Sequence, residues 1–465
     1  MRPQSDRKSS GGGSERLAVG VARRLEQEIK DRGWPIGEVL GSETALREQL
    51  GVSRSILREA VRLLENSQAA QMRQGPGGGL VVSVPDPRSS IRGLVISLEY
   101  LGATVDQLVY ARSVFERMAI DRIMHTLTEG SVQELRRSAA GAVGPPIDFH
   151  VTVGELSGNP LLELFVDVLA RLTAAYTQRA YAVTDDRSGE LQHAAQLHSE
   201  LADAIIAGDK YLAHQKLLAH LDDTTSWLRM YVAPLPGERT ATRPMDPDPG
   251  ERPREKKLAE HVAGWIHDDI VDEGRQIGEV VGSEPYFVEK YGVSRSVFRE
   301  AIRILEYYRV AQMRRGPGGG LVVLAPDPLA TVETIALYLD YRGISIDDLR
   351  AVRDELEMGV LTQVMRTAPP TADAIGVDGR CCSACLRDRM ADLSGDPVLV
   401  LFRSVLAVVW KQCAGPQFSH EVCVGGSGAP AERDELDALV EAVVSGDTEL
   451  ASFRLRAHLQ SHQEL

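Results

Sequence analysis

The sequence predicts a mainly α-helical protein built as two copies of one unit. Each unit consists of a small helix-and-hairpin domain followed by an all-helical bundle. The stretch "VSRSILREAVRLLE" at 52–65 returns as "VSRSVFREAIRILE" at 293–306, and the four differences replace one apolar residue with another. A Gly-rich hairpin pattern follows both copies at the same distance. The rest of each half has helical periodicity and no strand-like alternation.

The relation between the two halves covers whole domains. The 52–65 stretch and its hairpin recur at an offset of 241 positions, and "ELSGNPLLELFVDVLA" recurs as "DLSGDPVLVLFRSVLA" at an offset of 237. This period is too long for a solenoid, whose repeats span about 20–50 residues, so we expect a duplicated two-domain unit. The expected parts are a flexible tail at 1–13, small domains at 14–84 and 258–325, bundles at 89–232 and 329–465, and a Pro-rich, charged linker at 233–257.

The small domain begins with a helix over residues 14–32, where apolar residues recur at helical spacing. Ser42 is a typical N-cap for a second, short helix. Gly51 ends that helix, and Ser53 starts the next one. Two short helices joined by a tight, Gly-containing turn predict a helix-turn-helix.

The last helix of this domain has two different faces. Its apolar residues at 57, 60, 61 and 64 should pack inward, while Arg54, Arg58 and Arg62 form an outward stripe beside Ser55. An arginine stripe alone is most often a solvated helix face. Guanidinium groups also bind phosphates and guanine edges, and the first residues of the second helix reach the bases in a helix-turn-helix. Arg54, Ser55 and Arg58 are therefore the candidates for base contacts.

The segment "AAQMRQGPGGGLVV" predicts strand, Gly-rich turn and strand, with Arg73 at the edge of the turn. Glycines allow the backbone to approach another molecule closely. The turn leads into a strand rather than a helix, which argues against a nucleotide-phosphate loop. A helix-turn-helix followed by a hairpin is a winged helix, whose wing contacts phosphate or the minor groove of DNA.

The stretch "GSETALREQLGVSRSILREAVRLLE…MRQGPGGGLVV" and its second copy resemble the winged helix of the GntR superfamily of bacterial transcription regulators. The resemblance implies contacts with double-stranded operator DNA. With the arginines at the hairpin edges added, the candidate DNA-binding residues are Arg54, Ser55, Arg58, Arg73, Gly75, Arg295, Ser296, Arg299, Arg314 and Gly316. The family usually has Arg after the "SE" of its second helix. Thr44 and Pro285 stand there, which implies weaker binding or a different base preference.

The segments "SGNPLLELFVDVLARL" and "LHSELADAIIAGDKYLAHQKLLAHL" resemble the all-α effector (FCD-type) domain of the FadR-like branch of this superfamily. Many members of that branch bind a divalent metal through one Asp and three His. By this resemblance, His150, His198 and His220 would hold a Zn-type or Ni-type ion, although Pro146 stands at the Asp position. A single inward His is usually only a core residue. Three His at the spacing found in the family favour a metal or ligand pocket instead.

The second bundle has lost most of this set. Arg387 replaces the first His and Leu436 the second, and only His458 remains. We therefore expect a metal or ligand pocket in the first bundle alone. The five cysteines all lie in the second half, and this odd, one-sided set is not a disulfide framework. The pair Cys382-x-x-Cys385, next to Cys381, fits core cysteines best, with a thiol sensor or a zinc pair left open.

Composition limits the possible partners. The net charge of −14 excludes a uniformly basic coat but not a local DNA footprint. No apolar run reaches the roughly 18–20 residues that span a bilayer, and the polar N-terminus is not a secretory signal, so we expect a cytoplasmic protein without a membrane partner.

The sequence therefore predicts a sequence-specific DNA-binding transcription regulator, most simply a ligand-responsive repressor, and not an enzyme. Two winged helices on one chain would form an intramolecular pseudo-dimer that reads two similar half-sites, and a further homodimer of such chains is left open. Family resemblance allows a carboxylate, a fatty acid or an acyl-CoA as effector. One alternative is an architectural DNA-binding protein without small-molecule sensing. A remote one is a metal-dependent hydrolase using the three His, which would lack a placed general base.

Overall fold

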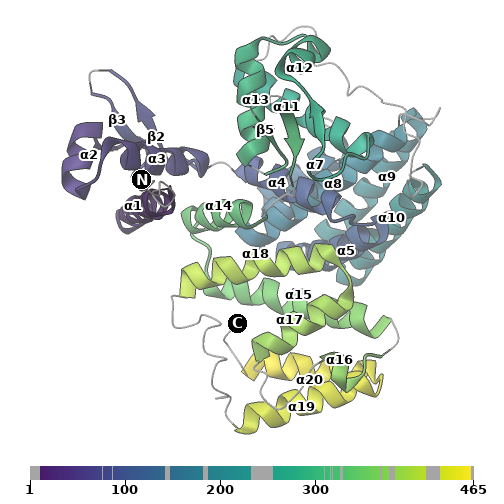
Figure 1. Ribbon diagram of the computed structural model, residues 1–465. Helices are drawn as coiled ribbons and strands as arrows, with labels where there is room; N and C mark the ends of the chain where they lie inside the picture. The colour runs from purple at the N-terminus through teal and green to yellow at the C-terminus, as the bar shows by residue number, and fades with distance from the viewer. Residues whose placement is uncertain are drawn as a thin grey trace, which may run out of the picture. The chain divides into compact units, whose positions relative to one another are not determined.

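The computed structural model shows a chain in which helices predominate (Figure 1). It describes residues 11–75, 77–85, 87–141, 147–181, 187–231, 255–307, 309–314, 316, 318–324, 328–366, 369–375, 383–414 and 430–461. The chain divides into two compact units, which differ from the two copies seen in the sequence. One comprises Met1–Ser90 with Glu333–Gly343, and the other comprises Ile91–Val332 with Ile344–Leu465.

The N-terminal part of the first unit, up to β3, has three helices and a small antiparallel sheet of strand order β1-β3-β2. Its elements are α1 (Gly11–Asp31), β1 (Val39–Gly41), α2 (Glu43–Leu50), α3 (Arg54–Asn66), β2 (Ala70–Arg73) and β3 (Gly79–Val82). The predicted first helix starts three residues early, inside the segment that we expected to be a tail. Residues 1–10 of that tail lie outside the described residues.

The predicted helix caps are present. Ser42 Oγ accepts a hydrogen bond from the Ala45 amide at 3.2 Å, and Ser53 Oγ accepts one from the Ile56 amide at 3.3 Å. Gly51 ends α2 in the left-handed region, at φ 66°, where an L side chain would be strained. These caps set the turn between α2 and α3 and so fix where the arginine-bearing helix begins.

The core of the first unit includes a residue from far along the chain. Leu57 and Leu64 of α3 pack with Leu25 of α1, as the sequence predicts, and Leu337 of α14 (Pro328–Tyr341) joins the same core. The ring of Trp34 meets the ring of Tyr341 edge-on at 5.4 Å between centroids. A segment more than 250 positions after β3 thus completes the domain.

Within the second unit, the segment from 255 to 323 repeats the element order of the first sheet domain. Its elements are α11 (Glu255–Asp272), β4 (Val280–Gly282), α12 (Glu284–Tyr291), α13 (Arg295–Tyr307), β5 (Ala311–Arg314) and β6 (Gly320–Val323). The strand order β4-β6-β5 and the pairing Ala311↔Val323 match the order β1-β3-β2 and the pairing Ala70↔Val82. Its core includes Ile96 of α4 (Pro87–Tyr100). Helix α11 takes up the last three residues of the expected linker, and residues 232–254 lie outside the described residues.

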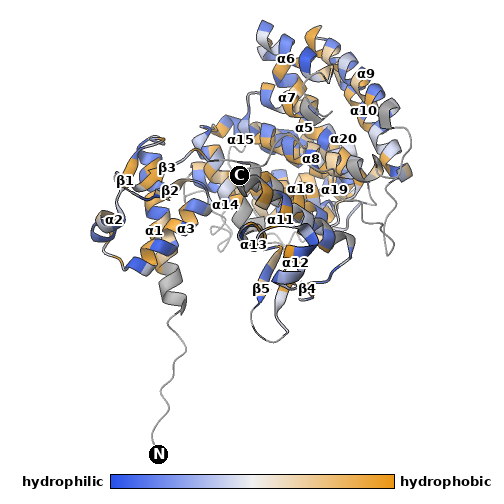
Figure 2. Ribbon diagram, turned by 90° about the horizontal axis from the view of Figure 1, so that it is seen from above, coloured by the Kyte–Doolittle hydropathy of each residue, from blue (hydrophilic) through white to orange (hydrophobic). Residues whose placement is uncertain are grey.

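Two helical bundles make up the rest of the second unit. The first contains α5 (Val105–Thr126), α6 (Glu129–Ala139), α7 (Ile147–Leu156), α8 (Pro160–Tyr181), α9 (Arg187–Ile206) and α10 (Lys210–Tyr231). The second contains α15 (Ile346–Arg366), α16 (Ala372–Ile375), α17 (Ser383–Ser394), α18 (Pro397–Ala414), α19 (Pro430–Val444) and α20 (Thr448–Ser461). Hydrophilic and hydrophobic residues share single helices such as α9 and α10, as amphipathic bundle helices require (Figure 2).

The bundles pack against each other through α5 and α8 of the first and α15 and α18 of the second. The rings of Phe165 and Phe402 stack there, with centroids 4.1 Å apart and planes 9° apart. These two residues are related by the 237-position offset, so a residue meets its own equivalent. Such a contact is expected on an approximate two-fold axis.

Candidate metal centre and nucleic-acid face

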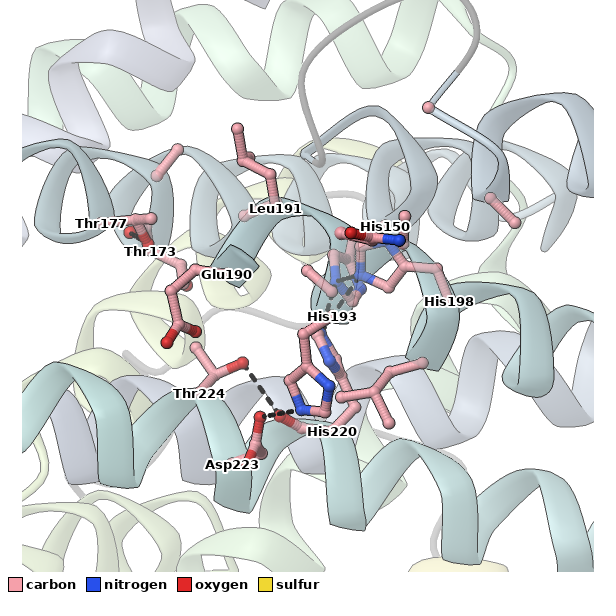
Figure 3. A pocket seen from close by; sticks show the side chains of 18 of the residues that line it. His150, Thr173, Thr177, Glu190, Leu191, His193, His198, His220, Asp223 and Thr224 are labelled. Carbon is pink, nitrogen blue, oxygen red and sulfur yellow. Dashed lines mark hydrogen bonds and ion pairs between the residues drawn. The ribbon is translucent and has the colours of Figure 1, made fainter. Parts of the chain in front are cut away.

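Three buried histidines converge inside the first bundle. His150 comes from α7, His198 from α9 and His220 from α10, and each is at most 5% exposed. Their Nε2 atoms lie 3.1 Å (150 to 198), 3.1 Å (150 to 220) and 3.3 Å (198 to 220) apart (Figure 3). The structure therefore brings together the three residues that the sequence singled out, from three different helices.

The spacing of these nitrogens fits a shared metal ion. Nitrogens at about 2.0–2.1 Å from one ion lie about 2.9 Å apart at a right angle and about 3.4 Å apart at the tetrahedral angle. A neutral imidazole has one donor and one acceptor nitrogen, so three Nε2 atoms in mutual contact cannot all be satisfied by sharing protons. The triad could hold a divalent metal ion, and among the described residues it is the one such cluster.

A buried carboxylate orients the first of the three histidines. Glu116 Oε2 lies 2.8 Å from His150 Nδ1, and Glu116 Oε1 accepts a hydrogen bond from Arg112 Nε at 2.6 Å. Burial alone would raise the pKa of Glu116, but the charges and hydrogen bonds of Arg112 and His150 lower that pKa to about 2. The ionised carboxylate accepts a hydrogen bond from His150 Nδ1–H, which leaves the Nε2 lone pair of His150 directed at the centre.

Burial also keeps the triad neutral. It lowers the pKa of His150 even though the charge of Glu116 raises it, and it lowers the pKa values of His198 and His220 well below the usual range for His. Neutral imidazole is the form that binds metal ions, so little proton competition is expected at neutral pH.

A cavity of about 500 Å³ opens beside the triad, which is a volume typical of small-molecule sites. Its wall includes Arg112, Thr173 and Trp227, and the hydrogen bond between His193 Nε2 and Asp223 Oδ2, 3.0 Å long, lies at its side (Figure 3). Arg112 Nη2 is buried and has no hydrogen-bond partner among the described residues. A buried guanidinium in the wall of a cavity favours an anionic ligand.

Sequence analysis missed Glu116 and Arg112. The pair has i,i+4 spacing, which on most helices marks a solvated surface pair. A usable signal was present, because Arg353 and Glu357 repeat the pair at the 241-position offset. The position at which the family has Asp, Pro146, lies outside the described residues.

The second bundle has a different interior at the equivalent place. Arg387 of α17 is 4% exposed, and its Nε lies 3.7 Å from Glu357 Oε1. His458 Nε2 is 2.7 Å from Ser383 Oγ, and the cavity beside Leu436 is only about 20 Å³. Cys381 and Cys382 lie outside the described residues, and Cys385 is half-buried.

The predicted DNA-reading residues lie on the surface of the first unit. Arg54, Ser55 and Arg58 occupy the first turns of α3 and are exposed. One carboxylate holds both arginines, because Glu43 Oε1 lies 2.7 Å from Arg54 Nε and 3.3 Å from Arg58 Nε. Thr44 beside it is exposed, at the position where the family has Arg.

The remaining candidates for DNA contacts in this domain lie on the hairpin. Arg73 ends β2, and Gly75 stands in the exposed turn at φ 105°, in the left-handed region that favours glycine. At the base of the hairpin a Cβ on Gly79 would lie 2.4 Å from the carbonyl oxygen of Gly41. The Gly-rich run is therefore required by the close packing of β1 on β3 as well as by the turn.

The segment from 255 to 323 presents the corresponding residues in the same way. Arg295, Ser296 and Arg299 are exposed in the first turns of α13, and Arg314 and Gly316 flank the turn after β5. The counterpart of Glu43 also contacts this stripe, because Glu284 Oε1 lies 3.2 Å from Arg299 Nη2.

Comparison with known families identifies the first half of the chain. Residues 17–80 match the family described as "Bacterial regulatory proteins, gntR family", and residues 107–223 match the FCD domain family. The first half carries a GntR-type DNA-binding domain and an FCD domain. The protein is therefore a DNA-binding transcription regulator and not an enzyme.

Known regulators are similar to this chain over about half of its length. The putative L-lactate dehydrogenase operon regulatory protein of Escherichia coli K12 is 28% identical over 250 residues, which cover 48% of this chain and 94% of the relative. The transcriptional regulator LutR of Bacillus subtilis is 26% identical, covering 44% and 97%. The transcriptional repressor NanR of E. coli K12 DH10B is 28% identical, covering 46% and 84%. No described helix is long and apolar enough to cross a membrane.

Proposed function

We propose that this GntR-type regulator is a ligand-responsive repressor that carries two DNA-reading heads on one chain. The heads are the winged helices at 14–84 and 258–325, and the effector domains are the bundles at 89–232 and 329–465. The observation that carries the proposal is the matching register of the two sheets, together with the same exposed Arg-Ser-x-x-Arg pattern at the start of α3 and α13. The protein would act in the bacterial cytoplasm.

The exposed residues of the two heads suggest two similar half-sites. Arg54, Ser55 and Arg58 reach base edges in the major groove, and Arg73 and Gly75 approach the backbone or the minor groove. Their counterparts in the second head are identical: Arg295, Ser296, Arg299, Arg314 and Gly316. The apolar differences between the recognition helices include residues of the packing face, so the cores have changed while the reading faces have stayed the same.

In the first bundle, and there alone, we propose a Zn-type or Ni-type ion held by His150, His198 and His220. Such an ion supplies a fixed positive charge with coordination positions open to a ligand. Arg112, in the wall of the same cavity, offers a second positive group. Both features favour a small carboxylate over a long fatty acid or an acyl-CoA. The name of the E. coli relative, an L-lactate dehydrogenase operon regulator, agrees with a small organic acid.

The effector controls DNA binding only if it prefers one arrangement of the two heads over another. The heads occlude a promoter when both half-sites are bound. An effector that stabilises another arrangement lowers operator affinity by its differential binding free energy.

Selection of bound duplexes from random DNA, followed by mobility-shift titration, tests the reading face. Arg54→Ala and Arg58→Ala should each weaken specific binding by about 1–3 kcal/mol. Arg62→Ala, one turn further along α3, is the matched control and should remove at most one phosphate contact. Unchanged binding in the two test variants would contradict the proposed reading face.

Light scattering of the complex tests the two-headed arrangement. One chain should occupy one operator with two half-sites, whereas two chains per minimal operator would contradict it. Operator affinity that does not change across a screen of metals and carboxylates would instead favour an architectural protein without a sensor.

A further inference from the structure

We propose that the contact surface between the two bundles is specific for unlike partners. The first bundle pairs with the second bundle of the same chain, and neither bundle pairs with a copy of itself. This inference rests on the proposed tandem arrangement, but it depends on neither operator binding nor the effector.

The two bundles meet in an approximately two-fold manner, which makes the possible pairings comparable. Positions of α5 and α15 correspond at the 241-position offset, and positions of α8 and α18 correspond at the 237-position offset. The Phe165–Phe402 stack joins two equivalent residues. A self-pair of either bundle would repeat this Phe–Phe contact, so the stack holds the interface together without selecting a partner.

The first selective contact is a tyrosine that fits over a glycine. Tyr110 Oη of α5 donates a hydrogen bond to the Gly359 carbonyl oxygen of α15 at 2.8 Å. A Cβ on Gly359 would already lie 3.3 Å from Cγ2 of Val114, and 3.7 Å from Tyr110 Oη. The guanidinium of Arg366 also lies over the Tyr110 ring, 5.1 Å from its centroid. The glycine leaves the space that the tyrosine occupies.

This contact exists only between unlike bundles. The equivalent of Tyr110 in the second bundle is Ala351, and the equivalent of Gly359 in the first is Met118. A self-pair of the first bundle would set Tyr110 against Met118, where the side chains compete for one space. A self-pair of the second would set Ala351 against Gly359 and leave a void.

The second selective contact is an ion pair with the same property. Arg122 Nη2 of α5 lies 3.1 Å from Asp348 Oδ1 of α15, and the side chains are 33% and 19% exposed. The equivalent of Asp348 in the first bundle is Gln107, and the equivalent of Arg122 in the second is Gln363. Either self-pair would therefore leave a partly buried charge opposite a neutral amide, which is unfavourable.

Shape and charge thus select the same partner at two different places on α5 and α15. Both bundles belong to one chain, so each finds its unlike partner at a high effective concentration. The surface consequently closes within the chain, and a second copy of the protein has no suitable partner surface left there.

The test uses the full-length chain with a protease site inserted between positions 240 and 245. The protein is cut after folding, and its assembly is measured by native mass spectrometry and sedimentation without DNA. We expect the two halves to remain together as a one-to-one complex of unlike halves. Ile96 and Leu337 also pack across the cut, so the variants of the bundle surface described next assign the selection to that surface. The cut protein is then diluted and remixed. Like pairs in the proportion expected for random pairing of the two halves would overturn the proposal.

Gly359→Met sharpens the test by placing the first bundle's residue in the second bundle. It should raise the dissociation constant of the cut halves about tenfold. Tyr110→Ala/Gly359→Met is the matched rescue, because both sides of the approximate two-fold then carry Ala opposite Met. It should recover association and allow like pairs to appear. If the double variant associates no better than Gly359→Met, the tyrosine does not select the partner.

Charge reversal gives an independent readout. Arg122→Asp should weaken association, and Arg122→Asp/Asp348→Arg should restore it, with circular dichroism confirming that each variant is folded. If the single and the double variant lose association equally, the ion pair does not select the partner. These outcomes are separate from operator binding, since a chain that pairs as expected but binds no DNA would refute the proposed function alone.

Discussion

The interiors of the two bundles share a buried Arg and Glu on one helix but differ in the groups that surround the Glu carboxylate. Both carry a buried Arg and a buried Glu four residues apart on one helix, Arg112 and Glu116 in the first bundle and Arg353 and Glu357 in the second. Arg112 is bonded to Glu116, whereas Arg353 contacts Asp354. In the first bundle the carboxylate orients an imidazole beside a cavity of about 500 Å³. In the second it faces a guanidinium beside a cavity of about 20 Å³.

The comparison suggests why the second interior needs no ion. Glu357 Oε1 lies 3.7 Å from Arg387 Nε and 3.1 Å from Arg403 Nε, so side chains supply its countercharge. A guanidinium stays protonated at any physiological pH and cannot dissociate from the protein. A metal ion can be removed, and its open positions take ligands. The proposed metal site would therefore let the first bundle respond to a ligand, whereas the second has a permanent positive group in its place.

Replacing the equivalent histidine in each bundle should give the largest difference, which is a difference in metal content. His220→Ala should abolish metal retention, while His458→Ala, the same change at the equivalent position, should leave it unchanged. Elemental analysis of dialysed protein measures the metal content. In wild type, metal at 100 times its Kd should stabilise the fold by about 2.7 kcal/mol, and His220→Ala should lose that increment. Equal metal content in the two variants would show that the triad is not the site.

Arg387→Met should have the next largest effect, on stability rather than on metal. It removes one of two guanidinium groups beside the buried Glu357 and should cost about 2 kcal/mol in the free energy of unfolding, less than the roughly 3–5 kcal/mol of a buried pair broken outright. Arg403 remains in place and limits the loss. Arg389→Met, an exposed position on the same helix, should change stability by no more than about 0.5 kcal/mol. A denaturant titration in which both variants unfold together would contradict the role of Arg387.

Glu116→Gln should have the smallest effect. The amide can still accept from His150 Nδ1 but carries no charge, so metal affinity should fall by about 10–100-fold. Glu357→Gln is the matched variant in the second bundle and should leave metal affinity unchanged. Calorimetric titration of metal into each apo-protein checks the difference. A loss of equal size in both would mean that the change acts through general stability.

The sequence predicted the parts of this protein that depend on local signals. The caps at Ser42, Gly51 and Ser53 were readable because short-range hydrogen bonds and backbone geometry determine them. The convergence of the histidines was predicted by family resemblance and confirmed by their Nε2 distances. The DNA contacts remain a prediction.

Features that depend on the choice of partner were not predicted. Periodicity marks Ile96 and Leu337 as buried, but it cannot say that each packs into a small domain other than the one it follows in the chain. The Arg112–Glu116 pair also looks like an ordinary surface pair until the helix is placed. The starts of α1 and α11 were each misplaced by three residues, because Gly and charged residues continued helices that apolar spacing alone did not mark.

The place of Leu337 in the first DNA-binding domain has a consequence during synthesis. The ribosome adds about 5–20 residues per second, so the 255 residues between Val82 and Leu337 take about 13–50 seconds. Throughout that time the nascent domain lacks one wall of its core. A chain that stalls or is cut short in this interval has a first DNA-binding domain whose core lacks Leu337.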